Sequence, residues 1–168
     1  SLINIVDNPK LNSIGDNRYS FSSNWFYNNI KKGSVYSDVL RKSTSNFFRN
    51  VCEGNATDNM VSTFDKYYNI IKDKGWSKAT NEYIHKKNLA YLINIFPHTS
   101  LTMYFNTRLN GKIKINEDMY ALSIMIQWIW RSRIRNQELS FEDRKINLYL
   151  PSKRMRTILL NWLNDTKN

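Results

Sequence analysis

The residues best suited to chemistry in this sequence are cations that can bind phosphate. Gln127, Arg131 and Arg135 recur every four residues inside an otherwise apolar segment, 119–135. Four-residue spacing places side chains on one face of a helix, and the planar guanidinium fork matches the oxygens of a phosphate or a carboxylate. The stripe therefore predicts either phosphate contacts or ion pairs with carboxylates of the same domain, and the sequence leaves both open.

A second group of cations follows a predicted strand near the C-terminus. Lys153, Arg154 and Arg156 fall in the first turn of a helix that opens at Pro151-Ser152. Cations there oppose the helix dipole at roughly 0.3–1 kcal/mol each, whereas the exposed backbone N–H groups of a first turn attract anions. We therefore expect a phosphate site at this turn, with a solvated helix start as the alternative. Lys112 and Lys114, on a predicted edge strand over 111–115, are further candidates.

The charge of the whole chain favours an anionic partner. The net charge is +11, and residues 85–168 hold 14 basic against 6 acidic side chains. Such a field attracts a polyanion through the release of its counterions. We expect the partner to be nucleic acid, DNA rather than RNA, with an acidic protein surface as the alternative.

Several kinds of chemistry are not supported. A phosphate-cradling loop needs Gly-x-x-x-x-Gly-Lys-Ser/Thr, but the one Gly-Lys pair, at Gly111, is followed by isoleucine and lacks the first glycine. His85, His98 and Cys52 have no metal-ligand spacing and no nucleophile–base arrangement. We therefore expect no metal, no cofactor and no enzyme activity from the chain on its own.

Composition indicates a folded protein outside the membrane. Apolar residues make up 41% of the chain, no run approaches the ~18 apolar residues of a membrane span, and a single cysteine suits a reducing compartment. We expect a cytoplasmic protein.

The pattern of apolar residues predicts one domain over 1–168, with a helical part at 1–78 and a basic part at 79–168. Strands are predicted at 2–6 and 146–150. Helices are predicted at 23–33, 34–53, 57–74, 81–96, 119–135 and 151–163. The expected fold is therefore α+β and predominantly helical, with about six helices and a small sheet.

The string from Tyr120 to Arg135, followed by a strand and Pro151-Ser152-Lys153-Arg154-Met155-Arg156, resembles the C-terminal region of superfamily 2 helicase-like proteins of phages and plasmids, over about residues 79–163. The last motif of that superfamily is Gln-x-x-Gly-Arg-x-x-Arg. The resemblance places Gln127 and Arg131 at its glutamine and first arginine, with Trp130 at its glycine and Ile134 at its second arginine. It implies an α/β RecA-like second lobe as the alternative fold.

These observations give three hypotheses. The first is a nucleic-acid-binding domain of a replication or recombination protein of a bacterial mobile element, without its own ATP-binding loop. The second is a phage-type interaction module or inhibitor that docks on an acidic host protein through exposed aromatic residues such as Tyr19, Phe21, Trp25 and Tyr27. The third is half of a split ATPase, in which Arg131 acts as an arginine finger with Gln127 beside it. Steep salt dependence of binding would distinguish the first.

Overall fold

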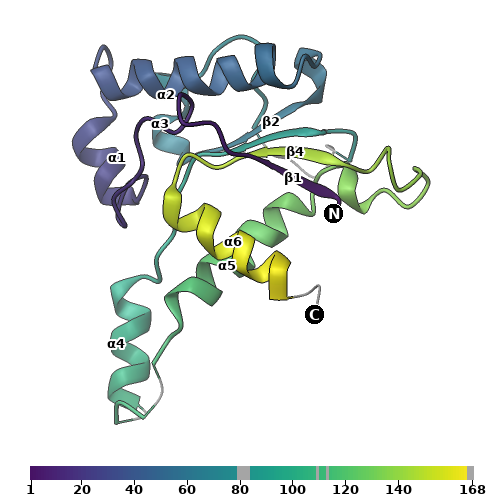
Figure 1. The fold of residues 1–168 in the computed structure, drawn as a ribbon. Coiled ribbons are helices and arrows are strands. Elements are labelled where there is room, and N and C mark those ends of the chain that lie inside the picture. The colour runs from purple at the N-terminus through teal and green to yellow at the C-terminus, as the bar shows by residue number, and fades with distance from the viewer. Residues whose placement is uncertain (79–83, 109, 113, 166–168) are drawn as a thin grey trace.

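The computed structural model describes residues 1–78, 84–108, 110–112 and 114–165. A four-stranded, wholly parallel sheet lies at its centre, in the order β1-β4-β3-β2. The strands are β1 (Ile3–Val6), β2 (Asn59–Ser62), β3 (Asn88–Tyr91) and β4 (Ile146–Tyr149). Helix α2 (Val35–Asn46) lies on one face, α5 (Glu117–Ile129) and α6 (Lys153–Asp165) lie on the other, and α1 (Ser23–Asn29) lies beyond one end of the strands (Figure 1). The sheet thus draws two strands from each of the two parts, 1–78 and 79–168.

The parallel sheet makes this an α/β fold, so the expectation of a predominantly helical α+β domain is wrong. Two segments predicted as helices each contain a strand, β2 within 57–74 and β3 within 81–96; residues 81–83 lie outside the described part. Every residue of β3 is buried. A strand covered on both faces has no polar alternation, so its continuous apolar run resembles a buried helix. The α/β alternative gave the right class.

An asparagine ladder crosses all four strands. Asn4, Asn147, Asn88 and Asn59 are in register across the sheet. Their side-chain amides donate in series, from Asn4 to Asn147 at 2.9 Å, from Asn147 to Asn88 at 3.1 Å, and from Asn88 to Asn59 at 3.2 Å. The last amide donates to the Gly75 carbonyl at 3.2 Å. The ladder fixes the register of the parallel strands, because a shift of one residue would break every bond in it.

Several elements predicted from the sequence are confirmed. Ser22 caps α1 and Ser34 caps α2, which continues into a π-helical turn over Phe47–Val51. Strands β1 and β4 and helix α6 also lie where they were expected. Short 3₁₀ turns cover Ala56–Asp58 and Arg133–Arg135, and helix α3 spans Asp65–Ile71.

Two predictions in the basic part are wrong. The helix expected over 119–135 ends at Ile129, so Arg131 and Arg135 do not continue a helical stripe from Gln127. No strand forms in the described residues of 111–115, and residue 113 lies outside them. Helix α4 (Thr99–Arg108), which was not predicted, projects from the body of the molecule and buries none of its residues (Figure 1). No helix in the described ranges is long and apolar enough to cross a membrane.

Candidate nucleic-acid interface

Arg131 lies in a small hollow at the end of the edge strand β2. The hollow has a volume of about 180 Å³ and is lined by Ser62, Thr63, Asp65, Lys78, Trp128 and Arg131, together with Val61. The Arg131 side chain is exposed and forms no hydrogen bond or ion pair with the described part of the chain. Its donors are therefore available to a ligand.

The turn that carries Arg131 is held firmly. Its backbone N–H donates to the Trp128 carbonyl at 3.1 Å, and the next residue, the buried Ser132, donates its hydroxyl to the Ile129 carbonyl at 2.7 Å. Trp128 packs against Tyr91 of β3 with ring centroids 5.2 Å apart. The guanidinium thus extends from a backbone anchored to the core.

The groups around this hollow suit an anion. Lys78 adds a second cation, although its ammonium lies 2.9 Å from the Asp65 carboxylate. That pair is close to neutral, so Arg131 leaves the hollow with a net positive charge. Ser62 and Thr63 supply hydroxyl groups, and the Thr63 Oγ1 atom is buried without a hydrogen-bond partner. Parallel sheets commonly bind ligands outside the carboxyl ends of their strands, and this hollow lies at that end of β2.

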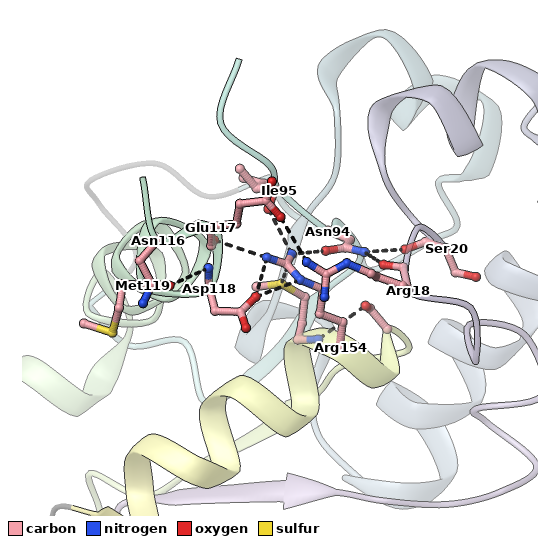
Figure 2. Close-up of polar contacts among 11 residues, drawn as sticks. Arg18, Ser20, Asn94, Ile95, Asn116, Glu117, Asp118, Met119 and Arg154 are labelled. Atoms are coloured by element: carbon pink, nitrogen blue, oxygen red, sulfur yellow. Dashed lines mark hydrogen bonds and ion pairs between the residues drawn. The ribbon is translucent and has the colours of Figure 1, made fainter. Parts of the chain in front are cut away.

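Arg154 has a different environment (Figure 2). Its side chain is only 5% exposed, and its guanidinium donates to Asn94 Oδ1 at 2.6 Å, to the Ile95 carbonyl at 3.1 Å, and to Asp118 Oδ1 at 2.7 and 3.1 Å. It also donates to the Glu117 carbonyl at 3.1 Å. All the acceptors belong to the chain itself, so this side chain fastens segments together.

The predicted anion site at the start of α6 is filled by the protein's own groups. The Lys153 N–H donates to the Gly15 carbonyl at 3.1 Å, and the Met155 N–H donates to Ser152 Oγ at 3.4 Å. The buried Arg156 donates to the Leu150 carbonyl at 2.6 Å and to the Pro151 carbonyl at 3.0 Å. Lys153 alone of the three cations is exposed.

The remaining candidates are dispersed. Gln127 is exposed on α5, and Arg135 is half-buried in the 3₁₀ turn. Lys112 and Lys114 are exposed on the segment between α4 and α5. None of these four lines the Arg131 hollow. Sequence reasoning missed Lys78, Ser62 and Thr63; the adjacent hydroxyl residues after an apolar run would have marked a strand end if β2 had been recognised.

Comparison with known proteins gives the family. The model of the YonV C-terminal Rossmann-like domain matches residues 1–163. The chain belongs to this family. It is 40% identical over 165 residues to the SPbeta prophage-derived uncharacterized protein YonV of Bacillus subtilis, an alignment that covers 94% of the chain and 37% of that relative. No solved structure matches.

Membership of this family contradicts the predicted fold class and supports the predicted phage origin. A Rossmann-like domain is an α/β fold, in agreement with the parallel sheet and against the predominantly helical prediction. The prophage relative supports the predicted phage origin. Neither description mentions a helicase, and the chain spans little more than a third of the YonV protein that it matches.

Proposed function

We propose that this domain binds nucleic acid through its phosphates, with Arg131 as the principal contact. The observation that carries the proposal is the hollow at the end of β2. There an exposed guanidinium with no partner in the described ranges lies beside the Lys78–Asp65 ion pair and two hydroxyl groups. Guanidinium groups and hydroxyls supply many of the contacts that proteins make to phosphate oxygens.

The wider charge distribution supports the same function. The net charge is +11, and Lys153, Lys112 and Lys114 are exposed and form no ion pair with another described residue, so they add positive potential. Arg154 and Arg156, which the sequence also assigned to phosphate, are hydrogen-bonded inside the chain and would act by positioning loops. Phage kinship is compatible with a part in replication or recombination of the element, and the helicase resemblance assigns Arg131 the same anion-binding chemistry.

The test is fluorescence anisotropy with labelled single- and double-stranded DNA, together with single-stranded RNA, at about 50 and 200 mM salt. Phosphate-dominated binding weakens steeply with salt. We expect Arg131→Gln to reduce affinity about threefold to tenfold on every sequence and to lower the log–log salt slope by about 1. Lys42→Gln is the matched control, because Lys42 is an exposed cation on α2, on the opposite face of the sheet from α5.

Two outcomes would contradict the proposal. Equal losses of affinity in Arg131→Gln and Lys42→Gln would show that the Arg131 hollow does not contact the nucleic acid. Absence of binding to all three nucleic acids at about 50 mM salt would reject the function. In that case, capture of a partner by the immobilised domain would test the acidic-protein hypothesis.

A further inference from the structure

Three adjoining hollows surround the start of α1, at the carboxyl edge of the sheet. Their volumes are about 550, 450 and 640 Å³. The first two share Tyr19, Ser22 and Asn24, and the last two share Ser23, Asn24 and Phe64. We call this continuous surface the α1 groove. Each hollow is within the size range of pockets that hold small ligands.

The position of the groove agrees with the fold. Its walls come from the chain that follows three parallel strands: residues 13–24 after β1, Phe64 after β2, and residues 94–99 after β3. This is the side of a parallel sheet on which α/β proteins bind ligands. The third hollow shares Asp65 with the Arg131 hollow, so the groove and the proposed phosphate site adjoin each other.

The walls of the groove are aromatic. Tyr19 is 60% exposed, and its ring lies 5.6 Å from that of Phe96 at an interplanar angle of 36°. The Arg18 guanidinium lies 6.0 Å from the centre of the Phe96 ring. Phe96 is half-buried, so Tyr19 is the exposed ring here, and an exposed ring beside a guanidinium is the kind of surface on which bases stack.

The polar groups of the groove favour a neutral ligand with hydrogen-bonding edges. Ser22, Ser23 and Asn24 line the central hollow, and the side-chain amide of Asn24 forms no hydrogen bond with another described residue. The Asp16 carboxylate lies in the first hollow and disfavours a phosphate there, whereas Asp65, in the third, is paired with Lys78. A flat heteroaromatic ring with donors and acceptors at its edge carries no charge and can form hydrogen bonds with these serine and asparagine side chains.

Buried groups hold this wall in place. The Asn94 amide, 1% exposed, donates to the carbonyls of Arg18 and Ser20 at 2.8 and 2.9 Å, which fixes the backbone on either side of Tyr19 (Figure 2). The Arg154 guanidinium lies 4.2 Å from the centre of the Phe96 ring. Because the backbone around Tyr19 and the ring of Phe96 are held before any ligand arrives, less ordering entropy would be lost on binding.

We propose that the α1 groove stacks an unpaired base of single-stranded nucleic acid on the exposed ring of Tyr19, which Phe96 contacts from within the groove, while the adjoining Arg131 hollow receives a phosphate. This inference rests on the proposed function and adds that the nucleic acid is single-stranded. Bases inside a duplex are already stacked and paired, so the groove selects single strands.

The test uses single-stranded oligonucleotides that contain 2-aminopurine, whose fluorescence falls when it stacks, with the same oligonucleotides in duplex form and free adenosine as further probes. We expect quenching on single strands only. Tyr19→Ala should weaken single-strand binding about fivefold to a hundredfold, the range of base stacking on an aromatic ring. Tyr19→Phe should retain binding, and Tyr104→Ala, which removes an exposed tyrosine on the projecting α4, should have no effect.

The outcomes separate this inference from the function on which it rests. Salt-dependent binding without 2-aminopurine quenching, and without loss in Tyr19→Ala, would overturn the base-stacking site and leave nucleic-acid binding in place. Binding of adenosine that is lost in Tyr19→Ala, with no binding of any oligonucleotide, would support the base site and overturn the proposed function. Absence of binding to every probe would overturn both.

Discussion

The Arg154 guanidinium connects both ends of the segment that carries the projecting helix α4. It binds Asn94 and Ile95 just after β3, and Glu117 and Asp118 at the start of α5. Helix α4, Thr99–Arg108, projects from the body of the molecule between these two pairs. The three donors of a lysine all lie on one nitrogen, whereas these acceptors are reached from three nitrogens of a planar fork, so arginine is required here rather than lysine.

Replacement of Arg154 by methionine should therefore destabilise the domain. The change leaves the buried Asn94 carbonyl oxygen and two backbone carbonyls without donors, so we expect a loss of about 2–4 kcal/mol in the free energy of unfolding. Urea denaturation followed by tryptophan fluorescence measures it. Lys153→Met, one residue away and exposed, should change stability by less than about 0.5 kcal/mol. Similar stabilities for the two variants would show that the Arg154 network has no structural role.

Cys52 should be an unreactive thiol at neutral pH. Burial raises the pKa of Cys52 to about 12 from an unperturbed 9.0, although Lys87 acts in the opposite direction. The reactive species is the thiolate, so alkylation by iodoacetamide at pH 8 should be at least about a hundredfold slower in the native domain than in urea. The unfolded thiol ionises first, so folding stability from this group declines as pH rises above 9.0. Equal alkylation rates in the two states would contradict this assignment.

At the scale of the elements, the asparagine ladder leads to a prediction about the stability of the domain. Asn88 is fully buried and bonds to neighbours on both sides. Asn88→Ala leaves Asn59 Oδ1 without its donor and the Asn147 amide without its acceptor, so we expect a loss of about 2–4 kcal/mol. Asn4→Ala, at the exposed end of the ladder, should cost under about 1 kcal/mol. Thermal unfolding of both variants measures the difference, and equal shifts in Tm would show that the buried links add nothing.

The four strands joined by this ladder differ in how well they could be predicted from the sequence. Helices with clear caps, such as α1 and α2, and the outlying strand β1 were predictable, because serine caps and turn residues mark their ends. The buried strands β2 and β3 were not, since an apolar run has no period of its own. Each strand nevertheless has an asparagine directly before a large apolar residue, in Asn4-Ile5, Asn59-Met60, Asn88-Leu89 and Asn147-Leu148. The same pair also occurs outside the strands, for example at Asn46-Phe47 and Asn69-Ile70 in helical segments, so it could not mark the strands by itself.

The candidate site could be predicted only in part, because the roles of its arginines depend on how the strands are arranged. Residue type identified Arg131, Arg154 and Arg156 equally, but their roles depend on which carbonyl groups lie within reach. The carbonyls of Ile95 and Leu150 lie in the chain that follows β3 and β4, and their proximity to α6 follows from the strand order. Before the sheet is known, a buried structural arginine cannot be distinguished from an exposed phosphate ligand.

At the scale of the whole molecule, the net charge of +11 is not concentrated at one site. Eight ion pairs among the described residues neutralise individual cations, including Arg49 by Asp73 and Lys87 by Asp58. The α1 groove itself contains carboxylates at both ends. The field of the molecule thus attracts a polyanion from a distance, whereas the groove and the Arg131 hollow decide what is recognised at contact.

The pairing of β1 with β4 has a consequence for biosynthesis. Ile3 pairs with Ile146, and β1 has no other neighbour in the sheet. At about 5–20 residues per second, a ribosome needs roughly 7–30 s to extend the chain from one partner to the other. During that time β1 is an unpaired apolar strand, and β3 lacks the neighbour that later covers its edge. The nascent chain is therefore most exposed to chaperones and proteases just before β4 emerges and closes the sheet.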